Sequence, residues 1–331
     1  MYTDEDLEIA VKKGIFSADS VEEFRDDYLK RRNTHTADEE NFRLIASFND
    51  IFVVIAIGLL LLSLGWVTYA IDSALSGFVV AAASWALAEF FVLNRKMALP
   101  AIALLVSFVG SVFAGVVALF GLPSENSLMI AGLVASISAW LHWRRFKVPI
   151  TVAAGAAALV VFVLSLIISV VPASKDFLVL MLFIGGMAVF TLAMYWDASD
   201  LQRISGKSDV AFWLHLTAAP LIVHPVFSVL GVLEGNESAV SLVSIILLYL
   251  FLTFISVVID RRAFMVSALV YVLVALTDLL DDYGLAGDGF AYVGVLIGFS
   301  LLLLSGFWHK ARLQLVMLLP GSIQSRVPAV L

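Results

Sequence analysis

Three side chains in this sequence combine acid–base chemistry with an apolar setting. His215 and His224 lie in the stretch DVAFWLHLTAAPLIVHPVF, residues 209–227, and Glu89 lies near the end of the apolar stretch 76–93. Ionisable groups within such stretches are costly to bury, and they are typical of proton and ion pathways. Together with Pro220 and Pro225, they form the candidate polar pathway.

Two prolines predict an interruption in the stretch that contains both histidines. Pro220 cannot bond the carbonyl of Leu216, and Pro225 cannot bond that of Leu221. The residue before a proline is disfavoured in the helical region, which applies to His224. We therefore expect a kinked or broken helix, and broken helices are typical of transport sites.

The spacing of the histidines argues against a shared metal site. They are nine residues apart, which is two and a half helical turns, so a straight helix directs them to opposite faces. We predict no metal and no cofactor. Each histidine is expected either to bond a neighbouring helix or to take part in proton relay.

Glu89 is the carboxylate placed furthest inside a predicted span. A buried carboxylate must be neutral, paired or in contact with water. Its position near Asn94, Arg95 and Lys96 also allows the side chain to reach the interface. His215 is expected at a similar depth, so a contact between the two is left open.

Other acids gather near span ends. A candidate outer cluster, which could attract cations or be ordinary surface, comprises Asp278, Asp281, Asp282 and Asp288. A second set lies beside arginines and lysines, and we expect solvated loop pairs there; its members are Asp197, Asp200, Asp209 and Asp260.

The elements that must position these residues are apolar helices. The 331 residues are 61% hydrophobic and 14% charged, with a mean hydropathy of +1.00, which is outside the range of soluble domains. Because the apolar runs are long and do not alternate, they predict an all-α membrane bundle of about ten transmembrane helices. The expected spans are 51–71, 76–93, 98–120, 127–142, 148–171, 177–195, 210–230, 239–259, 264–280 and 290–309.

The distribution of basic residues predicts the orientation. Nineteen of the 20 Lys and Arg residues precede the first span, follow the last, or lie in every second link, and the intervening links contain only Lys175. Since cytoplasmic loops are enriched in Lys and Arg, both termini are predicted to be cytoplasmic. The predicted location is a bacterial inner membrane, and the lipid bilayer is the first expected partner.

Two short segments flank the predicted membrane domain, 48–310. Residues 1–47 predict a cytoplasmic helical hairpin and linker, with Gly14 as a helix stop and Ser20 with Glu23 at capping-box spacing. This hairpin could dock on a cytoplasmic protein partner. Residues 311–331 predict a short cytoplasmic or interfacial tail.

Composition excludes several classes of function. The chain has no cysteine, and HExxH, GxSxG and P-loop motifs are lacking, so we expect no enzyme. A net charge of −7 gives no indication of nucleic-acid binding. Small residues at four-residue spacing predict close helix packing, with a homodimer as the alternative; they are Ala131, Ala135, Ala139, Gly294 and Gly298.

Three stretches resemble predicted bacterial inner-membrane proteins. They are FNDIFVVIA at 48–56, SDVAFWLHLTAAPLIVHP at 208–225 and FWHKARLQLVMLLP at 307–320. Together with the N-terminal hairpin, the plan is similar to the membrane proteins grouped as domain of unknown function 2157. The resemblance implies a polytopic membrane fold and no particular activity.

Two functional hypotheses follow. One is a transporter-like protein that moves a small solute or ion, with proton linkage through Glu89 and the histidines. The alternative is a membrane sensor or assembly scaffold that acts through the N-terminal hairpin. Sparse charge within the spans favours a proton-coupled or apolar-solute pathway over one for a highly charged solute.

Overall fold

The computed structural model describes residues 7, 10–23, 48–121, 123–201, 206–231, 239–282, 289–324 and 327, and contains no strand among them. The predicted all-α class is confirmed. By its contacts the chain divides into two units, residues 1–42 with Leu331, and residues 43–330.

In the N-terminal unit, two helical stretches meet at a turn. Gly14 ends the first stretch with a φ of +68°, a left-handed conformation that glycine adopts at little cost, and its N–H donates to the Val11 carbonyl. The second stretch begins at Ala18, where the Ser17 hydroxyl accepts from the Ser20 N–H at 3.1 Å. The cap is therefore Ser17 and not Ser20, because the helix begins three residues earlier than predicted.

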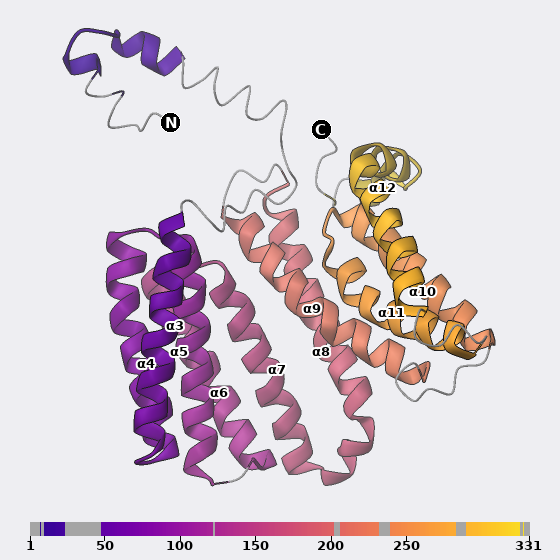
Figure 1. The fold of residues 1–331 in the computed structure, drawn as a ribbon, viewed down its shortest axis with the longest axis horizontal. Helices are drawn as coiled ribbons and strands as arrows, with labels where there is room; N and C mark the ends of the chain where they lie inside the picture. The colour runs from indigo at the N-terminus through magenta and orange to yellow at the C-terminus, as the bar shows by residue number, and fades with distance from the viewer. Residues whose placement is uncertain are drawn as a thin grey trace. The chain divides into compact units, whose positions relative to one another are not determined.

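Ten long helices follow within the described residues, and each overlaps one predicted span; Figure 1 shows their arrangement. They are α3 (Phe48–Tyr69), α4 (Ser73–Ala88) with a π-helical end η1 (Glu89–Asn94), α5 (Ala98–Leu119), α6 (Glu125–Phe146), α7 (Ile150–Val170), α8 (Leu178–Ala198) preceded by the 3₁₀ turn η2 (Pro172–Phe177), α9 (Lys207–Val229), α10 (Ala239–Ile259), α11 (Ala263–Asp282) and α12 (Gly289–Met317). A short helix, α13 (Gly321–Gln324), comes after them.

Seven helices in the described chain are long and apolar enough to cross a membrane: α3, α4 with η1, α5, α7, α8 with η2, α9 and α12. The described parts of α10 and α11 give shorter apolar helices, Val243–Ile259 and Ala263–Thr277. α6, which includes Glu125, His142 and two arginines, is not among them. A multi-pass membrane protein fits these helices.

α9 is the most enclosed of the seven. Of its apolar stretch 56% is buried, against 33% for α5, the next highest. It packs on α7, α8 and α11, and the largest apolar core surrounds it, with Leu214, Val223 and Phe227 fully buried. α9, which contains both candidate histidines, is thus enclosed by its neighbouring helices.

Close backbone approaches hold several helix pairs together. A Cβ on Gly77 of α4 would lie 2.4 Å from the Gly115 Cα of α5, and one on Gly132 of α6 would lie 2.7 Å from the Phe162 nitrogen of α7. Gly186 of α8 meets Leu221 of α9 in the same way. Ala131, Ala135 and Ala139 are buried, as ordinary bundle packing predicts.

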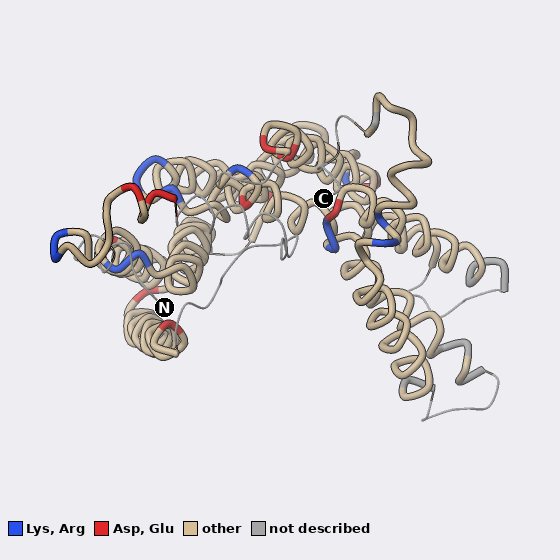
Figure 2. Tube along the Cα trace, turned by 90° about the horizontal axis from the view of Figure 1, so that it is seen from above, with Lys and Arg blue, Asp and Glu red and all other residues tan. Residues whose placement is uncertain are grey.

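α12 continues without interruption to Met317. Residues 309–317 therefore extend the tenth helix and form no separate one. Figure 2 shows that charged residues occupy only short stretches of the trace and that the bodies of the long helices contain almost none.

Candidate functional site

The densest buried polar group joins three parts of the second half of the chain. Asp197 lies in the last turn of α8, Ser208 and His215 lie on α9, and Arg261 lies in the three-residue link between α10 and α11. Short links bring the C-terminal ends of α8 and α10 to the N-terminal ends of α9 and α11. We call these four residues the Asp197 network.

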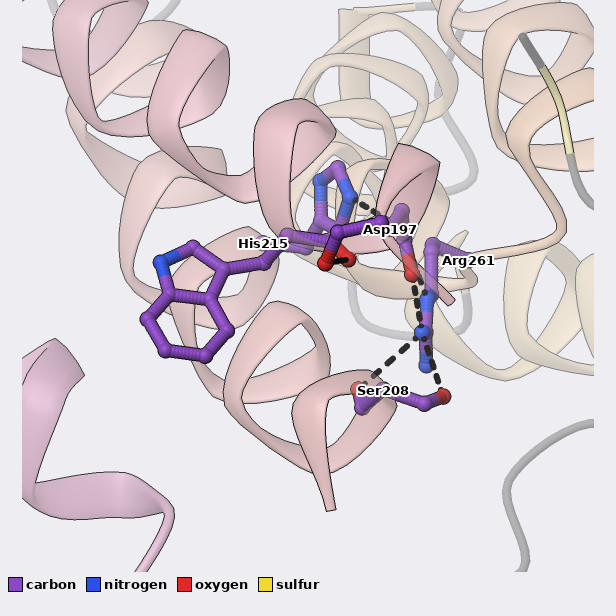
Figure 3. A network of polar contacts seen from close by, with 6 residues as sticks. Asp197, Ser208, His215 and Arg261 are labelled. Atoms are coloured by element: carbon purple, nitrogen blue, oxygen red, sulfur yellow. Dashed lines mark hydrogen bonds and ion pairs between the residues drawn. The ribbon is translucent and has the colours of Figure 1, made fainter. Parts of the chain in front are cut away.

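Asp197 is held from two sides (Figure 3). The Arg261 guanidinium donates to Oδ1 at 2.5 Å and to Oδ2 at 3.3 Å, and the His215 Nε2 lies 2.8 Å from Oδ2. The side chains of Asp197, His215 and Arg261 are 1%, 0% and 2% exposed, respectively. The ion pair is therefore shielded from water, which strengthens it and makes the loss of either partner costly.

Arg261 has further acceptors on α9. One of its terminal nitrogens donates to the Ser208 carbonyl and to the Ser208 hydroxyl, both at 3.1 Å. A planar guanidinium with five N–H groups suits this arrangement, since it can bond a carboxylate and a backbone carbonyl together. The link between α10 and α11 is thus fixed to both α8 and α9.

The contacts also determine the tautomer of His215. A carboxylate paired with an arginine only accepts hydrogen bonds, so the His215 Nε2 carries a hydrogen and donates it to Asp197. The rings of Phe190 and Phe264 flank the imidazole, with centroids 5.5 and 6.4 Å away. Uptake of one proton would turn this imidazole into a second buried cation against one carboxylate.

A second carboxylate lies next to Arg261 in the chain. Asp260 has a φ of +59°, a conformation that Asp tolerates better than most residues, and its Oδ1 accepts from the Trp308 Nε1–H at 2.9 Å. The Arg312 Nε lies 3.5 Å from the same oxygen, and the Arg262 guanidinium lies 4.9 Å above the Trp308 ring. α12 is therefore anchored to the same link.

This arrangement corrects one prediction. The acids at these span ends were expected to form solvated loop pairs, but Asp197 and Asp260 are buried and bonded. Hydropathy places them at span ends, whereas the packing of α8, α9 and α12 around the α10–α11 link removes them from water.

Glu89 does not meet His215. It lies at the first residue of η1, and its two oxygens accept from Arg145 of α6 at 2.9 and 2.7 Å. The side chains of Glu89 and Arg145 are 36% and 54% exposed. Of the alternatives for this carboxylate, pairing at the end of its helix is the one observed.

Of the two forms expected for the proline-containing helix, kinked or broken, the broken one is wrong. α9 runs as one helix from Lys207 to Val229 and includes Pro220, His224 and Pro225. Each proline removes one hydrogen bond only, and the helices packed around α9 hold the rest of its backbone in place.

The two histidines of α9 have separate partners. His224 is exposed, and its Nδ1 lies 2.8 Å from the Tyr271 hydroxyl of α11, whereas His215 is fully buried at Asp197. In the described part of the chain, no three Asp, Glu or His side chains are grouped as metal ligands. The outer acidic cluster lies outside the described residues, because the side chains of Asp278, Asp281 and Asp282 and the whole of Asp288 are not described.

Sequence reasoning missed His142, which is buried like His215. It lies in α6 among Trp85, Phe108 and Phe146, with ring centroids 4.5–5.9 Å away, and its Nδ1 is 3.3 Å from the Thr151 hydroxyl. One signal was available: Trp85 was the tryptophan far from any predicted span end, and it packs on this histidine. Arg261 could not be paired with Asp197 from the sequence, since 64 residues separate them.

Comparisons with known proteins do not define a family. The chain matches no protein-family model, no curated protein and no solved structure. The class that the fold supports is a helical multi-pass membrane protein, and the resemblance to domain of unknown function 2157 stays an expectation. Any more specific function must be argued from the geometry of the Asp197 network.

Proposed function

We propose that this chain is a proton-linked, transporter-like protein that moves a small solute or ion across a bacterial inner membrane. The proposal includes ten spans with both termini in the cytoplasm, which the alternation of basic links supports. It assigns the protein no enzymatic activity. The observation that carries it is the 2.8 Å contact between His215 and Asp197, both fully enclosed among apolar helices.

The Asp197 network has the parts that a protonation-controlled gate needs. With a neutral His215, the Asp197 carboxylate binds one cation only, and Arg261 holds the α10–α11 link to α8 and α9. A proton on His215 makes two cations share one carboxylate, which weakens the hold on Arg261. Movement of the α10–α11 link would then follow the protonation of the imidazole.

The test uses the full chain in proteoliposomes. An internal pH dye reports proton movement when gradients of inorganic ions and small metabolites are imposed one at a time. We expect the wild type to give flux that depends on pH, and His215→Gln to insert normally but to lose that dependence. His224→Gln is the matched control, since it changes the exposed histidine of the same helix and should leave the flux intact.

Two outcomes would contradict the proposal. One is wild-type flux equal to that of empty liposomes across the whole panel. The other is an equal loss of pH-dependent flux in His215→Gln and His224→Gln, which would mean that the effect does not come from the Asp197 network.

A sensor or scaffold is the second candidate, and one observation favours it. The N-terminal unit places two large apolar side chains at its turn, Ile15 and Phe16, which are 65% and 50% exposed. Exposed apolar side chains on a small unit suit a protein partner. On this hypothesis the wild type shows no flux, and His215→Gln acts only through stability.

A further inference from the structure

A surface in the first half of the chain collects basic residues from two links. Arg95 and Lys96 lie between η1 and α5, and Arg144, Arg145 and Lys147 lie at the end of α6. All five are exposed. Core residues that include Ala88, Ala101, Phe146 and Val148 pack together beneath them, so the two links adjoin. We call these five residues the basic surface.

The basic surface has a large excess of positive charge. Within residues 89–101 and 140–151 there are five bases and one acid, Glu89, so 5 − 1 leaves +4. Asp50 at the start of neighbouring α3 is buried and adds no exposed carboxylate. Glu89 already binds Arg145 in a two-bond contact, so four bases remain for a partner.

The equivalent end of the second half differs. The sequence there has seven bases, of which Arg203 and Arg326 lie outside the described residues, and four acids, Asp197, Asp200, Asp209 and Asp260, so 7 − 4 leaves +3. Of these bases, Arg261 and Arg312 are buried against the acids. The net charges of the two ends are thus similar, and what distinguishes the first half is that all five residues of the basic surface are exposed.

Aromatic rings lie next to three cations of the basic surface. The Arg144 guanidinium lies 5.1 Å above the Trp140 ring, the Arg95 guanidinium lies 5.7 Å from the Phe90 ring, and the Lys147 Nζ lies 5.4 Å from the Trp143 ring. Trp140 and Phe90 are 54% and 46% exposed. An exposed ring below a cation suits the boundary where acyl chains meet phosphate headgroups.

We infer that the basic surface is a binding site for an anionic phospholipid. The phosphate lies among Arg95, Lys96, Arg144 and Lys147, and the acyl chains lie along the apolar flanks at Phe90 and Trp140. Basic pockets between spans on the cytoplasmic side are the usual headgroup sites in membrane proteins. The inference concerns the α4–α7 region and is independent of the proposed proton linkage at Asp197.

The experiment measures lipid binding to the full chain. Protein in an uncharged detergent is titrated with phosphatidylglycerol or phosphatidylcholine, and bound lipid is counted by native mass spectrometry. Phosphatidylglycerol should bind at least tenfold more tightly, and salt should weaken it. Arg95→Gln with Arg144→Gln should lose roughly thirtyfold, since each base near an anionic group contributes about fivefold.

Two variants control for charge and fold. Lys207→Gln with Lys310→Gln also removes two exposed bases, but from the second half, and should change binding less than twofold. Arg95→Lys with Arg144→Lys keeps the charge and should retain most of the binding, which separates loss of charge from loss of structure.

Three results would overturn the assignment. They are equal binding of the two lipids, equal loss in the second-half control, and displacement of the lipid by millimolar inorganic phosphate. The last would mean that the site binds a free anion and not a lipid.

Discussion

The first five long helices and the last five use their charges in opposite ways. In α3–α7, the carboxylate–arginine pair of Glu89 and Arg145 is exposed, and close approaches at Gly77 and Gly132 bring the helices together. In α8–α12, the pair of Asp197 and Arg261 is buried and joins α8, α9 and the α10–α11 link. A carboxylate paired with a guanidinium is therefore a surface contact in the first region and a buried link between elements in the second.

The difference lies in where the pairs occur and in what surrounds them. An exposed pair competes with water and contributes little to stability, while a buried pair is costly to form and costlier to break by removing one partner. A rigid helical bundle requires only close helix packing and exposed ion pairs, which are the features of α3–α7. A buried titratable network in the second half is therefore the more informative feature for function.

Loss of the buried carboxylate should give the largest effect on stability. Asp197→Asn leaves the Arg261 guanidinium enclosed without a carboxylate, and we expect the free energy of unfolding in detergent to fall by about 3–5 kcal/mol. The matched change in the other region, Glu89→Gln, should cost much less, because water can solvate Arg145. Denaturant titration of both variants gives the two values.

A double variant sharpens this result. Arg261→Met added to Asp197→Asn removes the unpaired charge and should recover part of the loss. Equal stabilities for Asp197→Asn and Glu89→Gln would mean that burial does not distinguish the two pairs.

Much of the fold followed from the sequence, and the site did not. Apolar length and turn residues located ten helices, because hydropathy and helix stops such as Gly14 are local properties. The partners of Asp197 depend on how α8, α9 and the α10–α11 link pack, which no local pattern contains. His215 was identified as a candidate from its position in an apolar stretch, but a contact with Glu89 was left open, and its partner is Asp197.

The prediction for α9 differs from the structure for a related reason, because it used only the local effect of proline. The local rule for Pro220 and Pro225 is correct about the lost hydrogen bonds, yet the enclosure of α9 by α7, α8 and α11 keeps the helix continuous. Local preference predicted a kinked or broken helix, and tertiary packing keeps α9 in one piece.

The next largest effect tests how the first region is held together. Gly77→Ala places a Cβ 2.4–2.7 Å from the backbone of α5, so α4 and α5 must separate, and we expect a loss of about 1–3 kcal/mol. Gly298→Ala on α12 meets nothing within 4 Å and should be neutral or slightly stabilising. If thermal unfolding shows the two alanine variants to be equally stable, close approach does not stabilise the α4–α5 pair.

The smallest effect concerns the exposed pair of Lys175 and Glu125, at the opposite ends of these helices. Lys175 is the sole base of the predicted outer links, and it forms an ion pair with Glu125 at the start of α6. The hydrogen bond from Lys175, followed by a backbone bond and the charge of Lys175, lowers the pKa of the Glu125 carboxyl. This base is thus paired with a carboxylate from a neighbouring link at the same end of the helices.

The sign of the pH effect follows from that lowered pKa. A carboxyl whose pKa is lower in the folded protein stabilises the fold at pH above its unfolded pKa of about 4.3, and that contribution is lost as the pH falls through the folded value. Glu125→Gln should therefore reduce the melting temperature slightly at pH 7 and by less at pH 3. Because both side chains are about half exposed, the loss at pH 7 should also shrink in high salt. A loss that is unchanged between pH 7 and pH 3 would mean that Glu125 acts through packing and not through its charge.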